Sequence, residues 1–250
     1  MFVDFDGTIT KSDLGNEVFR ELIGNELFVK LHNQFLQNEI SIKTYWRLIC
    51  DGITELNYEK LKNSIDLITL KYEIDDYFIN FIDILKSNNI EITIISDGFE
   101  EYIKPILQKY NLNLNYYSNK LININNKITP LFQFQKEGCE CLSASCKKMN
   151  LLKNTFEEDL VIYIGDGLSD FCPAEHSDIV FAKGKLSKYC NQNNIPHYNF
   201  KTFFEINLIM KKLFDNQNLS IGEKSNKRIK EKLKIRNSAF IKRKLTFEVE

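Results

Sequence analysis

The amino-acid sequence predicts an α/β fold: a Rossmann-like parallel sheet with helices on both faces and an inserted helical cap. The first observation is that short, β-branched apolar runs alternate with longer stretches of helical periodicity. The second is that three of these runs end in polar loops with glycines, which begin at Asp4, Ser96 and Gly165. Because ligands bind outside the carboxyl ends of parallel strands, we expect these loops to meet at one edge of the sheet.

The composition is that of a globular protein. The 250 residues are 43% hydrophobic and 12% aromatic, with only four prolines and ten glycines, which argues against disorder or a fibre. No apolar run reaches the roughly 18 residues of a membrane span. The chain arrives at Asp4 without the long apolar segment of a secretory signal, so we expect a cytoplasmic protein with reduced thiols. Cys139, Cys141 and Cys146 cluster, but their spacing is a poor zinc signal.

The first predicted element is a short strand, Phe2-Val3, at the start of the chain. Residues 13–87 then place apolar side chains at helical spacing, with Ser41 as a predicted helix N-cap. About 80 residues between the first two polar loops are too many for a simple crossover between parallel strands. We therefore predict that residues 13–87 form the helical cap and that residues 1–12 and 88–214 form the core.

Strands and helices alternate after the predicted cap. Residues 90–95 form a short, β-branched run typical of a buried strand. Pro105 indicates a kinked helix, or a helix that begins near Lys104. The Asn125-Asn126 pair lies between two apolar runs and predicts the turn of a β-hairpin. The remaining predictions are a hairpin near 116–134, a helix at 145–153, strands at 160–164 and 178–182, and a closing helix at 202–214.

Carboxylates dominate the first and third polar loops. Asp4 and Asp6 are separated by one residue at a strand end, so they can face the same way and repel each other unless a cation or a proton is present. Gly7 frees the backbone to turn, and Asp166 and Asp170 supply further carboxylates. An oxygen-rich set without nearby sulfur or imidazole ligands favours a hard cation, and Mg²⁺ fits best.

Hydroxyl and amide donors accompany these acids. The Thr8 and Ser96 hydroxyls and the Gly98 amide can donate to a phosphoryl group, and a lysine from the 145–153 helix can add charge. With these donors in place, one carboxylate can attack phosphorus as a nucleophile while a second serves as acid and then base. The pattern therefore predicts phosphoryl chemistry on a small phosphorylated metabolite.

Each loop has another interpretation when it is taken alone. Residues 4–8 could be a turn with solvated acids, and Asp170 could cap a turn. Residues 165–167 are similar to part of a dinucleotide fingerprint, although the third glycine is absent. The lysines of the 145–153 helix could simply be solvated.

The order of the motifs is more specific than any single one. In sequence order they are Asp4-Phe5-Asp6-Gly7-Thr8, Ser96-Asp97-Gly98-Phe99, Cys146-Lys147 and Gly165-Asp166-Gly167-Leu168-Ser169-Asp170. This order resembles the haloacid dehalogenase (HAD) superfamily of phosphatases over roughly residues 1–214. The position of the cap points to subfamily IB, and the finer detail is similar to the group that contains the methionine-salvage enol phosphatase and phosphoserine phosphatase.

The resemblance implies a role for each matching residue. Asp4 is the implied nucleophile that becomes an aspartyl-phosphate, and Asp6 is the implied acid and base. Ser96 and Lys147 are implied to hold the phosphoryl oxygens, with Lys148 as the neighbour that could be confused with Lys147. The implied Mg²⁺ ligands are Asp4, the carbonyl of Asp6 and Asp166, with Asp170 in support.

Substrate selection is predicted to involve Asp13 and Asp97. Asp97 directly follows Ser96, so its carboxylate could favour a leaving group with an ammonium or a hydroxyl; the alternative is a helix N-cap. The cap residues Tyr45, Trp46 and Arg47 could line the pocket, or they could belong to the core.

These motifs are compatible with three classes of function. The first is a Mg²⁺-dependent phosphatase of a small phosphomonoester. The second is a phosphotransferase or mutase that passes the phosphoryl group to an acceptor other than water, and the third is a non-catalytic binding module with the same fold. The physiological substrate and the oligomeric state stay open.

The net charge of −1 hides two unlike parts. Residues 1–214 hold 23 basic and 29 acidic residues, a net −6, which gives this part no attraction to nucleic acid. Residues 215–250 hold 10 basic and 5 acidic residues, a net +5. This basic tail is predicted to be an exposed segment of unknown role, or an amphipathic helix for an unknown partner.

Overall fold

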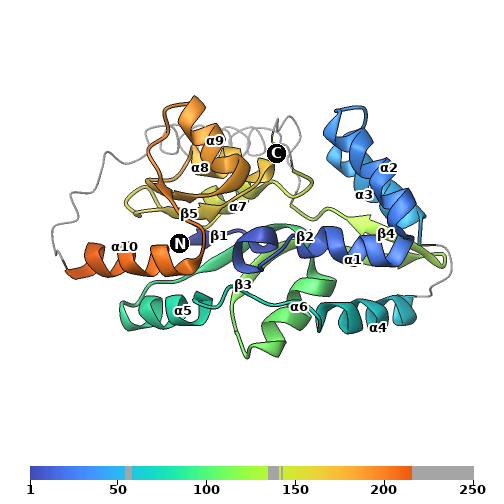
Figure 1. Cartoon of the computed structure of the whole chain (residues 1–250), viewed down its shortest axis with the longest axis horizontal. Coiled ribbons are helices and arrows are strands. Elements are labelled where there is room, and N and C mark those ends of the chain that lie inside the picture. Colours follow the sequence, from blue (N-terminus) through green and yellow to red (C-terminus); the bar gives the residue numbers. More distant parts are fainter. Residues whose placement is uncertain (54–57, 135–140, 142, 216–250) are drawn as a thin grey trace, which may run out of the picture.

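A single mixed sheet organises the molecule (Figure 1). The computed structural model describes residues 1–53, 58–134, 141 and 143–215. Within these residues seven strands lie in the order β4-β3-β2-β1-β5-β6-β7. All neighbouring strands are parallel except β4, which runs antiparallel to β3. The strands are β1 (Phe2–Val3), β2 (Thr93–Phe99), β3 (Asn115–Ile124), β4 (Lys127–Leu131), β5 (Ile162–Gly165), β6 (Ile179–Ala182) and β7 (Tyr198–Asn199).

Helices cover both faces of this sheet, so the predicted α/β Rossmann-like fold is confirmed (Figure 1). One face carries α7 (Lys147–Lys153), α8 (Phe171–Ala174) and α9 (Gly184–Gln192). The other carries α5 (Phe78–Ser87), α6 (Glu100–Lys109) and α10 (Phe203–Asp215).

Alternation along the strands divides the core between the two faces. Phe2 packs with the α7–α9 layer, and the next residue, Val3, packs with the α5–α6–α10 layer. Tyr163 and Ile164 divide in the same way. Successive side chains of a strand point to opposite faces, so a strand buried on both sides must be apolar throughout. This explains why the central strands appear in the sequence as continuous apolar runs.

A two-residue turn builds the hairpin of β3 and β4. Asn125 and Asn126 adopt left-handed φ angles of 51° and 62°, which suit the tight turns of hairpins and are tolerated by asparagine. The same β3 strand also pairs in parallel with β2, so the hairpin extends the central sheet.

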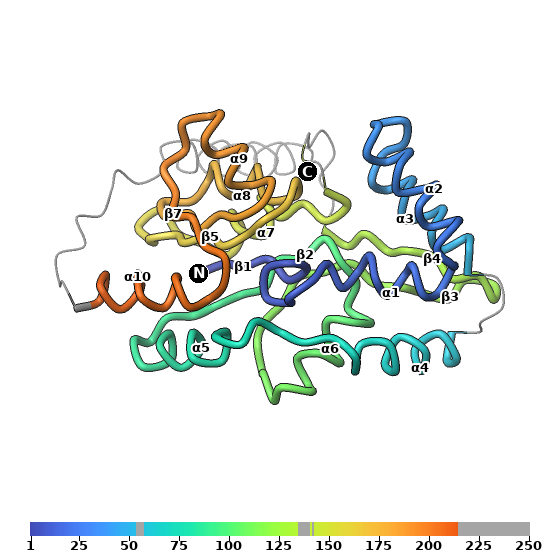
Figure 2. The backbone as a smooth tube through the Cα atoms, in the orientation of Figure 1, coloured from blue at the N-terminus to red at the C-terminus, as the bar shows by residue number. Residues whose placement is uncertain are grey.

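Four helices occupy most of the predicted cap range. They are α1 (Leu14–Ile23), α2 (Asn25–Leu36), α3 (Ile42–Asp51) and α4 (Tyr58–Thr69). Ser41 caps α3, because its Oγ accepts a hydrogen bond from the Thr44 amide at 3.1 Å. The pair α2 and α3 stands beside the sheet rather than over either of its helix layers (Figures 1 and 2).

Aromatic contacts join this helical region to the sheet. The ring of Phe19 in α1 lies 5.2 Å from Trp46 in α3 and 5.4 Å from Phe99 at the end of β2. By contrast α5, which also falls within residues 13–87, packs against α10 beneath the sheet. The boundaries of the cap and the core stay a prediction.

Several element boundaries differ from the sequence prediction. The second strand continues through Ser96-Asp97-Gly98, because Phe99 still pairs with Asn119 of β3 across an irregularity. Helix α6 begins at Glu100 and contains Pro105, so this proline does not mark the start of the helix. The short α8 and β7, and α9 in a polar stretch of the sequence, had no clear signal.

No helix in the described part of the chain is long and apolar enough to cross a membrane. The predicted cytoplasmic location stays a prediction. Cys139 and tail residues 216–250 lie outside the described residues.

The contact of α10 with α5 gives a stability prediction. Phe203 is fully buried, and its ring lies 4.9 Å from Phe78 and 5.0 Å from Phe81. We expect Phe203→Ala to lower the free energy of unfolding by about 3–5 kcal/mol, because it removes a large buried ring and leaves a cavity. Urea denaturation measures this loss. Phe156→Ala is the control, because Phe156 is 76% exposed, and its expected change is within about 0.5 kcal/mol.

Candidate active site

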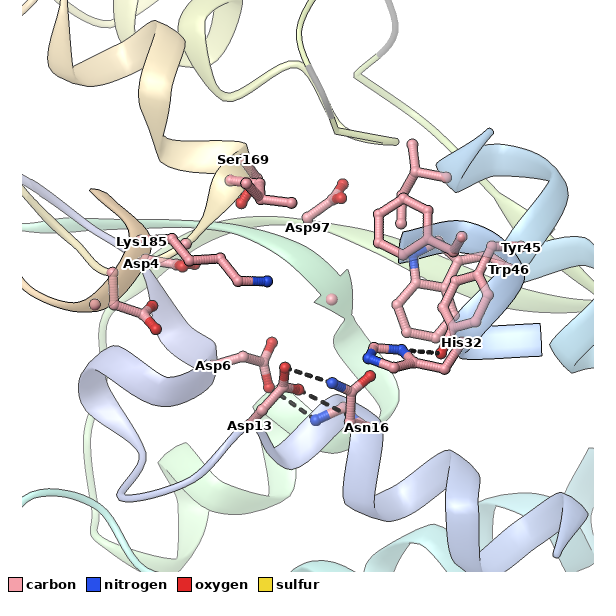
Figure 3. A pocket seen from close by; sticks show the side chains of 18 of the residues that line it. Asp4, Asp6, Asp13, Asn16, His32, Tyr45, Trp46, Asp97, Ser169 and Lys185 are labelled. Atoms are coloured by element: carbon pink, nitrogen blue, oxygen red, sulfur yellow. Dashed lines mark hydrogen bonds between the residues drawn. The ribbon is translucent and has the colours of Figure 1, made fainter. Parts of the chain in front are cut away.

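A cavity of about 390 Å³ opens where the predicted loops meet. It is lined by Asp4 and Asp6 after β1, by Asp97 and Gly98 in β2, and by Asp166 after β5. Figure 3 shows the acids Asp4 and Asp6 toward one end of the cavity, with the cap side chains Tyr45 and Trp46 toward the other. The sheet therefore brings together residues that are more than 150 positions apart in the chain.

The turn after β1 fixes the first acid. The Asp4 amide donates to the Ile164 carbonyl at 2.9 Å, and the Asp4 Oδ1 accepts from the Phe5 amide at 2.7 Å. Gly7 has a left-handed φ of 68°, and a Cβ at this position would lie 3.0 Å from the Asp166 Oδ2. A glycine is therefore required both by the turn and by the close approach of the Asp166 carboxylate.

Three carboxylates and one lysine form the centre of the site. Ligand oxygens of Asp4, Asp166 and Asp170 all lie within 4.8 Å of one another. The Lys147 Nζ lies 2.6 Å from the Asp4 Oδ1 and 2.7 Å from the Asp170 Oδ1, and its side chain is only 1% exposed. Three ionised carboxylates and one ammonium leave two negative charges uncompensated, and all the ligand atoms are oxygens. This donor set fits one hard divalent cation.

Asp170 anchors the loop after β5. Its Oδ2 accepts from the Asp166 and Gly167 amides, each at 2.9 Å, and its Oδ1 accepts from the Tyr163 hydroxyl at 2.5 Å. A Cβ on Gly165 would lie 2.5 Å from the Asp170 Oδ2, so only glycine leaves room for this carboxylate. Asp170 therefore shapes the loop that presents Asp166.

The pKa values of the acids report their surroundings. Burial and then the charge of Asp170 raise the pKa of Asp4 well above its ordinary value. Burial and then the charge of Asp170 also raise the pKa of Asp166 to about 6. Burial alone would raise the pKa of Asp170. The charge of Lys147 and its hydrogen bond outweigh this effect and lower the pKa of Asp170. Additional positive charge would relieve the repulsion that Asp4 and Asp166 feel.

Asp6 lies beside this cluster and has different partners. Its Oδ1 accepts from the Gly15 amide at 2.9 Å, and its Oδ2 accepts from the Tyr102 hydroxyl at 2.8 Å. Burial, followed by the charge of Asp13, raises the pKa of Asp6 to about 7. A carboxyl with such a pKa can hold or release a proton near neutral pH.

The predicted phosphate-binding residues take different positions. The Ser96 Oγ accepts from the Gly98 amide at 2.9 Å and lies 3.4 Å from the Asp6 Oδ2, while Gly98 itself lines the cavity. The buried Thr8 hydroxyl donates to the Asp166 Oδ1 at 2.9 Å, so it faces a carboxylate. Of the two neighbouring lysines, Lys147 lines the cavity. The phosphate-binding roles stay predictions.

Asp13 and Asp97 both line the cavity but are engaged with the backbone. Asp13 caps α1: its Oδ1 accepts from the Asn16 amide at 3.0 Å and its Oδ2 from the Asn16 side chain at 2.7 Å (Figure 3). The Asp97 Oδ1 accepts from the Ser145 amide at 2.6 Å, which ties β2 to the segment before α7. Their role in substrate selection stays a prediction.

The cap end of the cavity is largely apolar. Its lining includes Phe35, Leu36, Ile42, Tyr45 and Trp46. Arg47 was a candidate pocket residue together with Tyr45 and Trp46, but it is not among the lining residues.

Several polar residues of the site were not predicted from the sequence. Lys185 reaches into the cavity from α9, and His32 lines it from α2 (Figure 3). Tyr102 and Tyr163 donate to Asp6 and Asp170. Tyr163 directly precedes the Ile164-Gly165-Asp166 motif, but no short motif marks Lys185, His32 or Tyr102, because they reach the site through packing between elements that are distant in sequence.

Several solved structures have a fold similar to that of this chain. The chain is similar to phosphoserine phosphatase solved as a phospho-aspartyl intermediate analogue, with a TM-score of 0.61 and 20% identity, over 83% of this chain and 96% of that one. It is also similar to a HAD family hydrolase from Salmonella enterica subsp. enterica serovar Typhi, with a TM-score of 0.65 and 17% identity, over 84% and 70% of the two chains. These likenesses establish the fold.

Curated relatives match nearly end to end. The 2-hydroxy-3-keto-5-methylthiopentenyl-1-phosphate phosphatase of Lysinibacillus sphaericus (strain C3-41) is 28% identical over 228 residues, which are 86% of this chain and 95% of the relative. The protein of the same name from Bacillus thuringiensis (strain Al Hakam) is 27% identical over 221 residues, with 86% and 97% covered.

A protein-family model identifies the family of this chain. The Putative Phosphatase family matches residues 1–195, which contain every motif on which the resemblance depends. The predicted similarity to the group of enol phosphatases and phosphoserine phosphatases is confirmed. The chain therefore belongs to the Putative Phosphatase family and is a phosphatase of the haloacid dehalogenase type.

Proposed function

We propose that this protein hydrolyses a small phosphomonoester in a Mg²⁺-dependent reaction through an aspartyl-phosphate on Asp4. The observation that carries the proposal is the position of Lys147, whose ammonium lies between Asp4 and Asp170 at 2.6 and 2.7 Å. A fixed cation beside a fixed carboxylate lets a phosphoryl dianion approach that carboxylate, which would otherwise repel it.

Asp4 acts first. One of its carboxylate oxygens attacks phosphorus, and the bond between phosphorus and the leaving oxygen breaks. Lys147 offsets the charge on the phosphoryl oxygens, with Ser96 and the Gly98 amide that binds it beside the lysine. The product of this step is an acyl phosphate on Asp4.

Asp6 moves the proton in both steps. In the first it donates a proton to the leaving oxygen, so that an alcohol departs rather than an alkoxide. In the second it takes the proton of a water that attacks phosphorus, and the bond to the Asp4 oxygen breaks to release inorganic phosphate. The pKa of about 7 suits a group that must both give and take a proton.

Asp4 and Asp166 would hold Mg²⁺ together with the Asp6 carbonyl, in agreement with their oxygen-only donor set, and Asp170 would support them through the loop that it fixes. When bound, the ion neutralises phosphoryl charge and orients the phosphate. Thr8 and Gly7 support this role, because one donates to Asp166 and the other leaves space for it.

The cap end of the cavity favours a leaving group with an apolar arm. Phe35, Tyr45 and Trp46 offer apolar contacts there, with His32 beside Tyr45 (Figure 3). The bacterial relatives are named for a substrate that carries a methylthio group, an apolar end of this kind. We propose a metabolite of this class.

The nucleophile assignment gives the first prediction for activity. We expect Asp4→Asn to lower phosphate release from an aryl phosphate with Mg²⁺ by roughly 10³-fold or more, because an amide cannot form the acyl phosphate. Asp83→Asn, an exposed position in α5, is the matched control and should retain the full rate. Equal rates for Asp4→Asn and the unaltered protein would remove Asp4 from the role.

Metal binding is tested without turnover. Saturating Mg²⁺ at about 100 times its Kd should stabilise the unaltered protein by about 2.7 kcal/mol, which raises Tm by roughly 5–10 °C at this size. Asp166→Asn should lose most of this shift because it removes one of three carboxylates, whereas Asp83→Asn should keep it. Differential scanning fluorimetry measures both, and an undiminished shift in Asp166→Asn would exclude it as a ligand.

The apolar arm is tested with a series of unbranched alkyl phosphates. We expect kcat/KM to rise roughly fourfold for each methylene until the cap end is filled, since each buried methylene contributes about 0.8 kcal/mol. Phosphoserine, whose leaving group is charged, should be a poorer substrate than an alkyl phosphate of the same length. A flat series, or a preference for phosphoserine, would contradict the proposed class.

A further inference from the structure

Tyr102 combines a core ring with a hydroxyl that reaches the active site. It lies in α6, whose other buried residues are Ile103, Ile106 and Leu107, and it is 1% exposed. Its ring packs 6.4 Å from that of Phe5, centroid to centroid. Its hydroxyl nevertheless lines the cavity and donates to the Asp6 Oδ2 at 2.8 Å.

Two glycines make room for this hydroxyl. A Cβ on Gly98 would overlap the Tyr102 hydroxyl oxygen and come within 2.6 Å of the Asp6 Oδ2. A Cβ on Gly15 would come within 2.7 Å of the same hydroxyl oxygen. Neither glycine has a left-handed φ, so backbone freedom does not require them. The space that they leave contains the hydrogen bond between Tyr102 and Asp6.

Three donors hold the two oxygens of Asp6, and the Ser96 hydroxyl, 3.4 Å from the Oδ2, makes the longest of the three contacts. The Gly15 amide, at the start of α1, binds the Oδ1 at 2.9 Å, and Tyr102, from α6, binds the Oδ2 at 2.8 Å. A carboxylate with one donor can still rotate about its terminal bond, whereas donors on both oxygens define its plane. Small errors in the position of a proton-transferring group cost a large part of its effect.

We propose that Tyr102 is a positioning residue that fixes the Asp6 carboxyl for proton transfer to the leaving oxygen. This inference rests on the proposed function, in which Asp6 is the acid and base. In this arrangement the Tyr102 hydroxyl donates its hydrogen bond to the Asp6 carboxylate. Its effect on the reaction therefore passes entirely through Asp6.

A purely structural role for the hydroxyl makes a different prediction. Buried tyrosine hydroxyls normally find an acceptor, and Asp6 could serve only as that acceptor. Loss of the hydroxyl would then change stability or lower all rates together. A positioning role instead makes the loss depend on how much the leaving group needs a proton.

The test is Tyr102→Phe, which keeps the ring and removes the hydroxyl. The measured quantity is kcat/KM, with Mg²⁺, for p-nitrophenyl phosphate and for an alkyl phosphate. The alkyl substrate leaves as a strongly basic alkoxide unless Asp6 protonates it. We expect a loss of about 10–100-fold for the alkyl phosphate, a part of the roughly 10²–10⁴-fold that general acid catalysis contributes, and less than about threefold for p-nitrophenyl phosphate. Equal losses for the two substrates, or no loss for either, would overturn the proposal.

A double-mutant cycle shows whether Tyr102 acts through Asp6. In an Asp6→Asn background, Tyr102→Phe should cause no further loss on the alkyl phosphate, because the group that it positions is gone. Additive losses would show that the hydroxyl acts by another route. Tyr189→Phe is the matched control: Tyr189 also donates to a carboxylate, that of Glu175, but it does not line the cavity, so both rates should stay unchanged.

A second variant guards against a folding defect. Gly15→Ala leaves Tyr102 in the chain but places a methyl group against its hydroxyl, and it should reproduce the same dependence on the leaving group. If the unaltered protein and Asp4→Asn release phosphate at equal rates, it is the proposed function that fails. If Asp4→Asn is inactive and Tyr102→Phe behaves as the unaltered protein, only the role of Tyr102 fails.

Discussion

The ion pair of Lys147 with Asp4 and Asp170 is the interaction on which the active site depends. All three side chains are nearly inaccessible to solvent, and a buried carboxylate is costly unless a cation compensates it. The lysine comes from α7, one acid follows β1 and the other follows β5, so the pair also locks three elements of the fold together. Only one of two adjacent helix residues can point toward the sheet edge, which is why Lys147, and not Lys148, lines the cavity.

Close approach of carboxylates demands glycines around this centre. Gly7 and Gly165 leave space for Asp166 and Asp170, and Gly98 and Gly15 leave space for the contact between Tyr102 and Asp6. The glycines thus do more than allow turns. They set how near the acids can come to one another and to the backbone, and this distance decides whether a cation is required.

Local patterns predicted most of the fold. The apolar runs that became β1, β5 and β6, the hairpin turn at Asn125-Asn126 and the N-cap at Ser41 are all encoded by neighbouring residues. The predictions were less accurate where long-range pairing overrides local preference. Residues 96–98 look like a loop, but the pairing of Ile95 and Phe99 with β3 on either side of them keeps them in the strand, and Pro105 is accommodated within α6.

The sequence by itself determined the order of the acidic motifs along an alternating α/β chain, and hence the phosphatase class, because strand ends and glycine-rich loops are local features. The tertiary structure decided which side chains meet. Thr8 turns to Asp166, Asp97 binds the Ser145 amide, and Tyr102 reaches Asp6 from a helix nearly 100 residues away. These contacts depend on how helices pack on the sheet, and packing between distant segments leaves no periodic signal in the chain.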